Sequence, residues 1–170
     1  MLELANRITM KGNPMTLLAK NELKVGDQAP DATLVAGDLS EVKISSFKGK
    51  KLIISVVPSL DTGICDLQTK RLNKEATHLT DTIVLTVSMD LPFAQKRWCG
   101  ATNSTSIQTV SDYRYASFGE AYGVLIKGLR LLARAIYVVD AAGKIRYIQL
   151  VKEVTTEPNY EEVLKAVKNL

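Results

Sequence analysis

The stretch Leu52-Ile-Ile-Ser-Val-Val57-Pro58-Ser-Leu-Asp-Thr62-Gly-Ile-Cys65 decides the fold of this chain. Its first part is a run of apolar, mostly β-branched residues, which predicts a buried strand. The residues that follow carry apolar side chains at helical spacing, which predicts an amphipathic helix beginning near Cys65. A cysteine is therefore expected where a central strand passes through a short loop into a helix.

This position favours a reactive cysteine. The first turn of a helix has backbone N–H groups without intrahelical partners, and the helix dipole is positive there. Both features stabilise an anion, which for cysteine is the thiolate. If the turn is helical, the Thr62 hydroxyl and the Cys65 sulfur share one face, and Pro58, which has no N–H, fixes the chain entering the loop. The structural alternative is an inert, buried Cys65 with Thr62 as a helix cap, but the strand-to-helix junction favours chemistry.

The composition is that of a globular protein. The chain has 170 residues, of which 46% are apolar and 24% charged, so it can form a core without disulfide staples. The net charge of +4 is scattered, and the lysines at 48–51 are better explained as a solvated strand entrance than as a nucleic-acid patch. No run has the length of a membrane span, and no secretion signal is visible. We expect one domain over residues 1–170, in the cytoplasm, with neither a nucleic-acid nor a membrane partner.

Two cysteines and one histidine limit the other chemistries. Cys65 and Cys99 are too few for a disulfide scaffold, and they do not form the Cys-x-x-Cys pair of a thioredoxin-like redox loop. With His78 they make a poor metal site, so no metal site is predicted. His78 also lies too far along the predicted helix to serve as a base for Cys65, which disfavours a Cys–His hydrolase.

The remaining sequence predicts an α/β fold of the thioredoxin-like type. The strand at 52–57, the helix after Cys65 and a strand at 83–88 form a right-handed parallel crossover. A turn at 140–143 makes the strands on either side of it antiparallel. Further elements are expected as a β-hairpin over 7–18, short strands at 32–35, 42–44 and 107–110, and helices after residues 90, 114 and 158. The result is a mixed sheet flanked by helices on both faces, with an added N-terminal β-hairpin.

Three local features carry more specific expectations. Asp90 should cap the helix that follows it, with Pro92 in the first turn. The leucine-rich segment 124–132 should be partly exposed, as a substrate wall or a partner surface. The helix after Cys65 should expose polar residues including Gln68, and its apolar face should comprise Ile64, Leu67, Leu72, Ala76 and Leu79.

A family resemblance enters at the strand-to-helix junction. The motif Pro58-x-x-x-Thr62-x-x-Cys65 after a buried strand resembles the active-site motif of the peroxiredoxins. Three more blocks, in the same order, resemble the bacterial thiol peroxidase subgroup: Asp90-Leu-Pro-Phe-Ala-Gln-Lys-Arg-Trp-Cys99-Gly, Leu131-Leu-Ala-Arg134-Ala and Thr155-Thr-Glu-Pro158. The resemblance spans essentially the whole chain, and on this basis the sequence is identified as a member of the atypical 2-Cys peroxiredoxins.

The resemblance implies a role for each matched residue. It implies that Cys65 is the peroxidatic cysteine, that Cys99 is the resolving cysteine, and that Thr62 and Arg134 assist them while Pro58 shapes the pocket. It further implies an intrachain disulfide between Cys65 and Cys99 that is reduced by thioredoxin. Hydrogen peroxide and organic hydroperoxides are the implied substrates, a homodimer is the implied assembly, and no metal, haem or other cofactor is implied.

The residue chemistry is compatible with these roles but leaves alternatives. The thiolate attacks peroxides, and Arg134 is charged at every relevant pH, although a surface salt bridge is its structural alternative. Cys99 alternatively packs beside Trp98 as a structural cysteine. Because Cys65 begins one predicted helix and Cys99 ends another, a disulfide between them is expected to require local unwinding.

Other functions remain open from the residues alone. A thioredoxin-fold disulfide reductase is disfavoured by the missing Cys-x-x-Cys pair. A redox sensor that changes partner when Cys65 and Cys99 bond would use the same disulfide, and a plain structural protein would show no peroxide reactivity. The leucines of segment 125–132 are expected either to wall a pocket for apolar hydroperoxides or to form the dimer surface.

Overall fold

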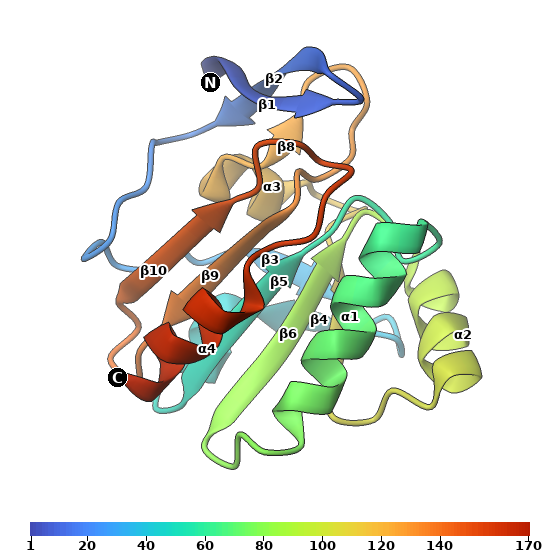
Figure 1. The fold of residues 1–170 in the computed structure, drawn as a ribbon, viewed down its shortest axis with the longest axis vertical. Helices are drawn as coiled ribbons and strands as arrows, with labels where there is room; N and C mark the ends of the chain where they lie inside the picture. Colours follow the sequence, from blue (N-terminus) through green and yellow to red (C-terminus); the bar gives the residue numbers. More distant parts are fainter.

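The computed structural model describes residues 1–170, and a mixed β-sheet forms its centre (Figure 1). The strands are β1 (Leu2–Met10), β2 (Asn13–Ala19), β3 (Thr33–Val35), β4 (Glu41–Lys43), β5 (Lys51–Val56), β6 (Thr82–Ser88), β7 (Gln108–Ser111), β8 (Leu125–Ile126), β9 (Ala135–Val139) and β10 (Ile145–Leu150). The helices are α1 (Gly63–Ala76), α2 (Pro92–Thr102), α3 (Ser117–Tyr122) and α4 (Tyr160–Lys168), with a short 3-10 helix, η1 (Ile44–Phe47). None of the helices combines the length and the apolar character that a membrane span needs.

The predicted thioredoxin-like mixed sheet is confirmed. The seven strands of the central sheet lie in the order β10-β9-β5-β6-β7-β3-β4, and a three-stranded sheet has the order β1-β2-β8. β5 pairs parallel with β6, as the crossover through α1 requires, and antiparallel with β9. β9 and β10 form the predicted antiparallel pair. β5 therefore lies in the interior of the sheet, with a strand on either side, which explains its continuous run of apolar residues.

Helices cover both faces of the central sheet, as predicted, but unequally. Ile53 belongs to an apolar cluster with α1, α2 and α4, whereas the next residue, Ile54, belongs to a larger cluster with α3 and the N-terminal sheet. The change of face between neighbouring residues follows from the two-residue period of a strand. In Figure 1, α1 and α4 lie in front of the sheet, and the β1–β2 hairpin lies at one end.

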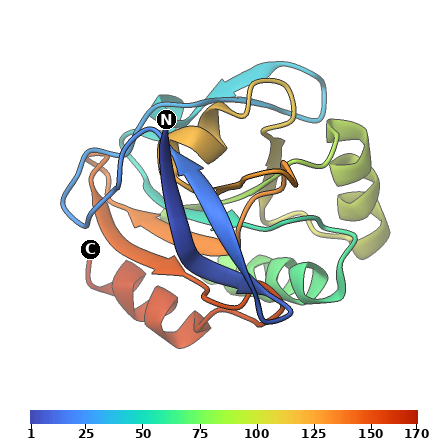
Figure 2. The ribbon, with the colours of Figure 1, turned by 90° about the horizontal axis from the view of Figure 1, so that it is seen from above.

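The predicted N-terminal hairpin is present and is longer than expected. β1 and β2 pair antiparallel from Leu2 opposite Ala19 to Met10 opposite Asn13. Near the tip, Thr9 N donates to the carbonyl of Lys152 at 2.7 Å. Seen from above, the hairpin crosses the top of the molecule toward the loop that follows β10 (Figure 2). Its tip is thus fixed beside residues 152–154, close to the start of α1.

The buried face of α1 differs from the prediction. Its buried residues are Cys65, Gln68, Thr69 and Leu72. Their spacing makes Cys65 the first member of the inner stripe of the helix. Leu67, predicted in the core, is 50% exposed, whereas Gln68, predicted on the wet face, is fully buried. Hydropathy misplaced the face because three of the four residues in the stripe are not aliphatic.

Asp90 does not cap α2, so that prediction is wrong. The residue that precedes α2 is Leu91, and Pro92 begins the helix, as predicted. The Asp90 carboxylate instead accepts hydrogen bonds from Ser59 Oγ at 2.6 Å and from Leu60 N at 2.8 Å. The carboxylate is therefore committed to the loop between β5 and α1 rather than to its own helix.

The leucine-rich segment 124–132 is mostly core, contrary to the prediction of an exposed loop. Leu125 and Ile126 form β8, which pairs with β2, and both are buried together with Leu132. Leu129, by contrast, is 46% exposed. Local sequence could not predict this burial, because the partner strand belongs to the N-terminal hairpin.

The helix predicted after residue 114 is present as α3, and two of the three aromatic residues at 115–122 are buried. Phe118 and Tyr122 stack in the core with ring centroids 4.2 Å apart. Tyr115 lies before α3 and is half exposed, because Ala116 adopts a left-handed conformation that separates it from the helix. Gly123 follows α3 in a left-handed conformation, which glycine adopts without steric cost.

A pair of glycine substitutions tests this packing. A methyl group at Gly119 would lie 2.7 Å from Leu132 Cδ2 and 3.1 Å from Leu125 Cβ, whereas at Gly100, in α2, it would meet nothing within 4 Å. Gly119→Ala is therefore expected to lower the free energy of unfolding by about 1–3 kcal/mol. Gly100→Ala is expected to raise it by about 0.5–1 kcal/mol, because alanine favours the helix. Urea unfolding measures both, and equal effects of the two substitutions would contradict the close packing at Gly119.

Candidate active site

Two hydrogen-bond donors converge on the sulfur of Cys65. Cys65 lies in the first turn of α1 and is fully buried. Its Sγ is 2.6 Å from Thr62 Oγ1 and 3.4 Å from Arg134 Nη2. The structure thus brings together three of the residues that the sequence singled out.

The Thr62 hydroxyl has a second acceptor. Its Oγ1 also lies 3.1 Å from the carbonyl of Ser59. A hydroxyl carries one hydrogen, so Thr62 can donate to the sulfur when Cys65 is a thiolate and to Ser59 when Cys65 keeps its own proton. The same arrangement therefore serves both protonation states of the cysteine. Thr62 precedes α1 but makes no side-chain cap bond, which disfavours its interpretation as a simple helix cap.

Arg134 is a buried cation without a carboxylate partner. It immediately precedes β9 and is only 2% exposed. Besides the sulfur, its guanidinium donates to the Val154 carbonyl at 2.9 Å and to Gln68 Oε1 at 2.8 Å. A surface salt bridge, the alternative considered from the sequence, is therefore wrong. A buried charge is costly unless an anion offsets it, and among these three partners only the Cys65 sulfur can become one.

Gln68 belongs to the site and was missed in the sequence. Its amide nitrogen donates to Ser55 Oγ of β5 at 2.8 Å, while its oxygen accepts from Arg134. Gln68 and Ser55 are both fully buried. The chain of hydrogen bonds Ser55–Gln68–Arg134–Cys65 therefore links the strand β5 to the Cys65 sulfur. Gln68 lies three residues after Cys65 on the helix, and this spacing was the sequence signal that both side chains share one face.

An apolar hollow of about 720 Å³ opens above these donors. Pro58, Thr62 and Arg134 are among its lining residues. Its other walls come from the hairpin tip, α1 and two loops, with Met10, Lys11, Gly63, Ile64, Asp66, Leu67, Leu131, Val154 and Thr155. Leu131 is its only contributor from the leucine-rich segment. Apolar walls around a few converging polar groups are typical of a small-molecule site.

Cys99 contacts other residues than Cys65 does. It belongs to α2, is partly exposed, and its Sγ lies 3.6 Å from Thr109 Oγ1. Both cysteines are free thiols. α2 continues beyond Cys99 to Thr102, so Cys99 lies within the last turns rather than at the helix end. The two sulfurs therefore have different hydrogen-bond partners.

The remaining candidates contribute no second site. His78 is exposed and lies beyond the end of α1, away from the start of the helix where Cys65 is found. No group of three or more histidine, cysteine or acidic side chains is arranged to hold a metal ion. The chemistry that the arrangement supports is therefore that of a thiolate held between a hydroxyl and a guanidinium.

Comparison with known proteins shows the family of this chain. The family described as Redoxin matches residues 24–164. The thiol peroxidase of Bacillus subtilis (strain 168) is 55% identical over 163 residues, covering 96% of this chain and 97% of that one. The thiol peroxidase of Halalkalibacterium halodurans is 55% identical over 161 residues, covering 95% and 96%.

Solved structures give the same result for the fold. The crystal structure of a peroxiredoxin-like protein from Aquifex aeolicus superposes with a TM-score of 0.90 and 45% identity, covering 98% of each chain. A thiol peroxidase from Chromobacterium violaceum superposes with a TM-score of 0.85, covering 98% of this chain and 96% of that one, at 19% identity. The second similarity concerns the fold alone.

The role of Gln68 can be tested against a matched glutamine. Gln68→Leu removes one partner of Arg134, so the guanidinium is held less firmly at the sulfur. In a Cys99→Ser background, alkylation of Cys65 by iodoacetamide at pH 7 is expected to slow about tenfold, the factor that corresponds to 1.4 kcal/mol of lost thiolate stabilisation. Gln95, which is also buried and also bonds a serine, is the control. Gln95→Leu should destabilise the fold without slowing alkylation, and equal slowing by both would contradict the assignment.

The hairpin wall of the hollow depends on one carboxylate. Glu153 accepts hydrogen bonds from the Thr155 hydroxyl at 2.6 Å, from Thr155 N at 2.8 Å and from Gly12 N at 2.8 Å. The hydroxyl of Thr155, followed by these amides, lowers the pKa of Glu153 to about 2. Because this lies below the ordinary value of 4.5, the stabilisation is complete above pH 4.5 and is lost as the pH falls through 2.

Glu153→Gln is therefore expected to lower the Tm at pH 7, and its difference from the wild type should shrink as the pH approaches 2. Calorimetry at several pH values measures this. Glu161→Gln, which neutralises an exposed acid in α4, should change the Tm little at any pH. A Glu153→Gln effect of constant size across the pH range would show that the carboxylate charge is not what holds the hairpin tip.

Proposed function

The chain belongs to the redoxin family as an enzyme of the thiol peroxidase type, which reduces peroxides with a protein thiol, and we propose that Cys65 is the sulfur that reacts. The observation that carries this proposal is the pair of donors, Thr62 Oγ1 and Arg134 Nη2, aimed at Cys65 Sγ below an apolar hollow. The thiolate is the nucleophilic form of cysteine. A buried guanidinium, a hydroxyl donor and a helix N-terminus all favour that form.

In the proposed reaction the Cys65 thiolate attacks one oxygen of a hydroperoxide. A sulfur–oxygen bond forms while the oxygen–oxygen bond breaks. The sulfur is oxidised by two electrons to a sulfenic acid, and the peroxide is reduced to an alcohol, or to water when the substrate is hydrogen peroxide. The leaving oxygen takes up a proton from solvent as it departs.

The surrounding donors would stabilise the transition state more than the ground state. During the displacement, negative charge moves from the sulfur through the attacked oxygen to the leaving oxygen. Thr62 Oγ1 and the Arg134 guanidinium are fixed on one side of that path, and the first backbone N–H groups of α1 lack intrahelical partners. Donors that are already oriented need no reorganisation when the charge moves, which is the largest source of catalysis in sites of this kind.

The walls of the hollow support organic hydroperoxides as substrates besides hydrogen peroxide. Pro58, Ile64 and Leu131 present apolar surface next to the donors. An alkyl group attached to the peroxide would lose water contact there, which favours binding. Pro58 shapes the entrance, because its missing N–H leaves no donor that would need to be satisfied by solvent at that point.

Cys99 would complete the cycle. Its sulfur attacks the Cys65 sulfur, a disulfide forms, the sulfur–oxygen bond breaks, and the oxygen leaves as water. A thioredoxin then reduces the disulfide by thiol–disulfide exchange. A cycle that depends on a dithiol reductant suits a reducing compartment, and we therefore place the protein in the cytoplasm. No metal, haem or other cofactor takes part in this scheme.

Exposed apolar side chains support a homodimer. Leu91 and Phe93, at the start of α2, are 51% and 64% exposed. Contact with a second copy would remove this apolar surface from water.

The hollow also supports a single domain over residues 1–170. The hairpin residues Met10 and Lys11 line the same hollow as Pro58 and Arg134.

Intact mass tests the proposed chemistry. After one equivalent of hydroperoxide, the wild type is expected to lose two hydrogens, as the disulfide requires. Cys99→Ser is expected to gain one oxygen that a thiol removes, because the sulfenic acid has no resolving partner. If both proteins keep their mass while the peroxide persists, Cys65 is not a peroxide-reactive sulfur. Turnover with a thioredoxin system separates a peroxidase from a protein that oxidises only once.

A further inference from the structure

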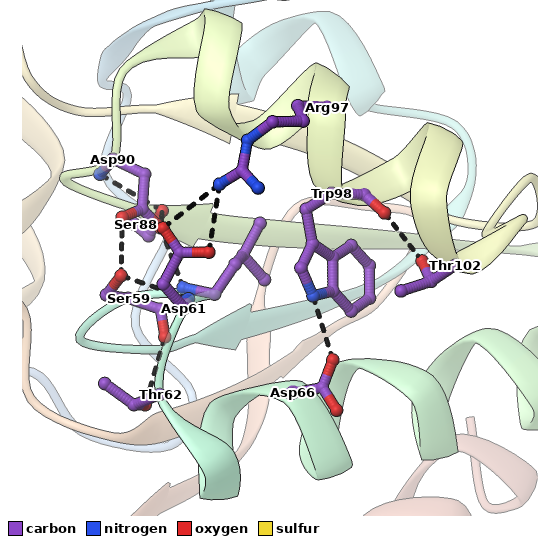
Figure 3. A network of polar contacts seen from close by, with 10 residues as sticks. Ser59, Asp61, Thr62, Asp66, Ser88, Asp90, Arg97, Trp98 and Thr102 are labelled. Atoms are coloured by element: carbon purple, nitrogen blue, oxygen red, sulfur yellow. Dashed lines mark hydrogen bonds and ion pairs between the residues drawn. The ribbon is translucent and has the colours of Figure 1, made fainter.

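Polar contacts join the helix that carries Cys99 to the segment that carries Cys65 (Figure 3). The indole nitrogen of Trp98, in α2, donates to Asp66 Oδ1 of α1 at 2.9 Å. The neighbouring Arg97 pairs with Asp61 in the loop before α1, with Nη2 at 3.1 Å from Oδ1 and 3.3 Å from Oδ2. Neither contact touches the Cys65 sulfur, and the peroxide chemistry does not use them.

The position of the Trp98–Asp66 bond relative to the cysteines is informative. Asp66 directly follows Cys65, and Trp98 directly precedes Cys99. The bond therefore joins the chain neighbours of the two sulfurs. Any unwinding that moves Cys65 out of the first turn of α1, or Cys99 out of α2, must displace one end of this bond. Trp98 is 6% exposed and packs in the same apolar cluster as Cys65, so its displacement also exposes a large ring.

The Arg97–Asp61 pair adds to this contact at the surface. Its side chains are 66% and 59% exposed, so the pair alone is weak. Because Arg97 and Trp98 are adjacent on one helix, the two contacts must break together when that part of α2 moves. They can be removed separately, since one is an exposed ion pair and the other a half-buried hydrogen bond.

The start of α2 is held by a different group. Asp90 accepts bonds from Ser59 Oγ, Leu60 N and Ser88 Oγ, the last at 2.8 Å. These bonds fix the loop before α1 to the end of β6 (Figure 3). Movement of Cys99 is therefore expected in the second half of α2, beyond this anchor, where Trp98 and Arg97 lie.

We propose that Trp98 and Arg97 are positioning residues that form a latch on Asp66 and Asp61, and that release of this latch sets how fast Cys99 reaches the oxidised Cys65. The proposal rests on the proposed function, since it concerns the fate of the Cys65 sulfenic acid. Two reactions compete for that group. Cys99 converts it to the disulfide and water, whereas a second hydroperoxide adds another oxygen to the sulfur and leaves as an alcohol, giving the sulfinic acid.

The latch therefore controls the ratio of disulfide to sulfinic acid. The disulfide forms at a rate that does not depend on peroxide, and the sulfinic acid forms at a rate proportional to it. At one hydroperoxide concentration, half of Cys65 becomes sulfinic acid. That concentration equals the first-order rate constant of disulfide formation divided by the second-order rate constant of sulfinic acid formation. A weaker latch raises the rate of disulfide formation and raises this concentration by the same factor.

The test compares three variants by rapid acid quench and intact mass, with cumene hydroperoxide as the oxidant. Trp98→Phe keeps an aromatic ring, although a smaller one, and removes the N–H. The rate of disulfide formation is expected to rise about threefold to tenfold, because a hydrogen bond to a charged group is lost. Arg97→Met removes the exposed pair and is expected to raise the rate about twofold. Lys96→Met, which removes the same charge from an exposed neighbour on α2, is expected to leave it unchanged.

The second readout is the hydroperoxide concentration that converts half of Cys65 to sulfinic acid. In each variant it should rise by the same factor as the rate of disulfide formation. A purely structural contact would lower the Tm without moving the two quantities together. Since the chain has one tryptophan, the fluorescence of Trp98 in Arg97→Met reports the release directly. Arg97→Met also keeps the test informative if Trp98→Phe folds poorly.

The proposed function and the latch fail in different ways. If the Cys99→Ser chain gains no oxygen on Cys65, the proposed function falls. If Cys65 is oxidised equally fast in every variant but Trp98→Phe and Arg97→Met form the disulfide at the wild-type rate, or more slowly, only the latch is overturned.

Discussion

The buried guanidinium of Arg134 is the constraint on which the rest of the structure depends. Its three nitrogens donate to the Val154 carbonyl, to Gln68 and to the Cys65 sulfur. These partners belong to α1 and to the loop after β10, so one cation fixes two segments against the end of β9. The cost of burying this charge is reduced by the hydrogen bonds to Gln68 and Val154, and an anion beside it would reduce it further. The contacts that hold these segments together and the surroundings of the Cys65 sulfur therefore share one side chain.

This constraint also decides which side of α1 faces inward. With Cys65 and Gln68 both bound to Arg134, the inner stripe of the helix is fixed, and Ile64 and Leu67 are left beside it. Both line the hollow above the site rather than the core. Apolar residues that would ordinarily stabilise the fold become the walls of a pocket, and polar residues take their buried places. The pattern that misled the hydropathy analysis is therefore a direct consequence of the site.

The sequence predicted what local physics determines. Runs such as 52–57 and 135–139 are apolar and β-branched because they are central strands, and the Pro58–Cys65 motif placed the candidate sulfur and its hydroxyl correctly. Contacts between distant segments could not be predicted in this way. The pairing of β8 with the N-terminal hairpin buried a segment expected to be exposed. Gln68 was assigned to the wet face of its helix and Asp90 to a helix cap, because their partners, Arg134 and Ser59, come from elsewhere in the chain.

Segment 58–66 is held in two unequal ways, and the difference suits the proposed cycle. Toward Arg134 the contacts are buried, whereas toward α2 they include an exposed ion pair. On the buried side, Thr62 and Arg134 both donate toward the Cys65 sulfur. In the proposed cycle the sulfur becomes a neutral sulfenic acid, which offers the Arg134 guanidinium no counter-charge. After such a reaction, the contacts of Trp98 and Arg97 with Asp66 and Asp61 would be what still holds the segment against α2.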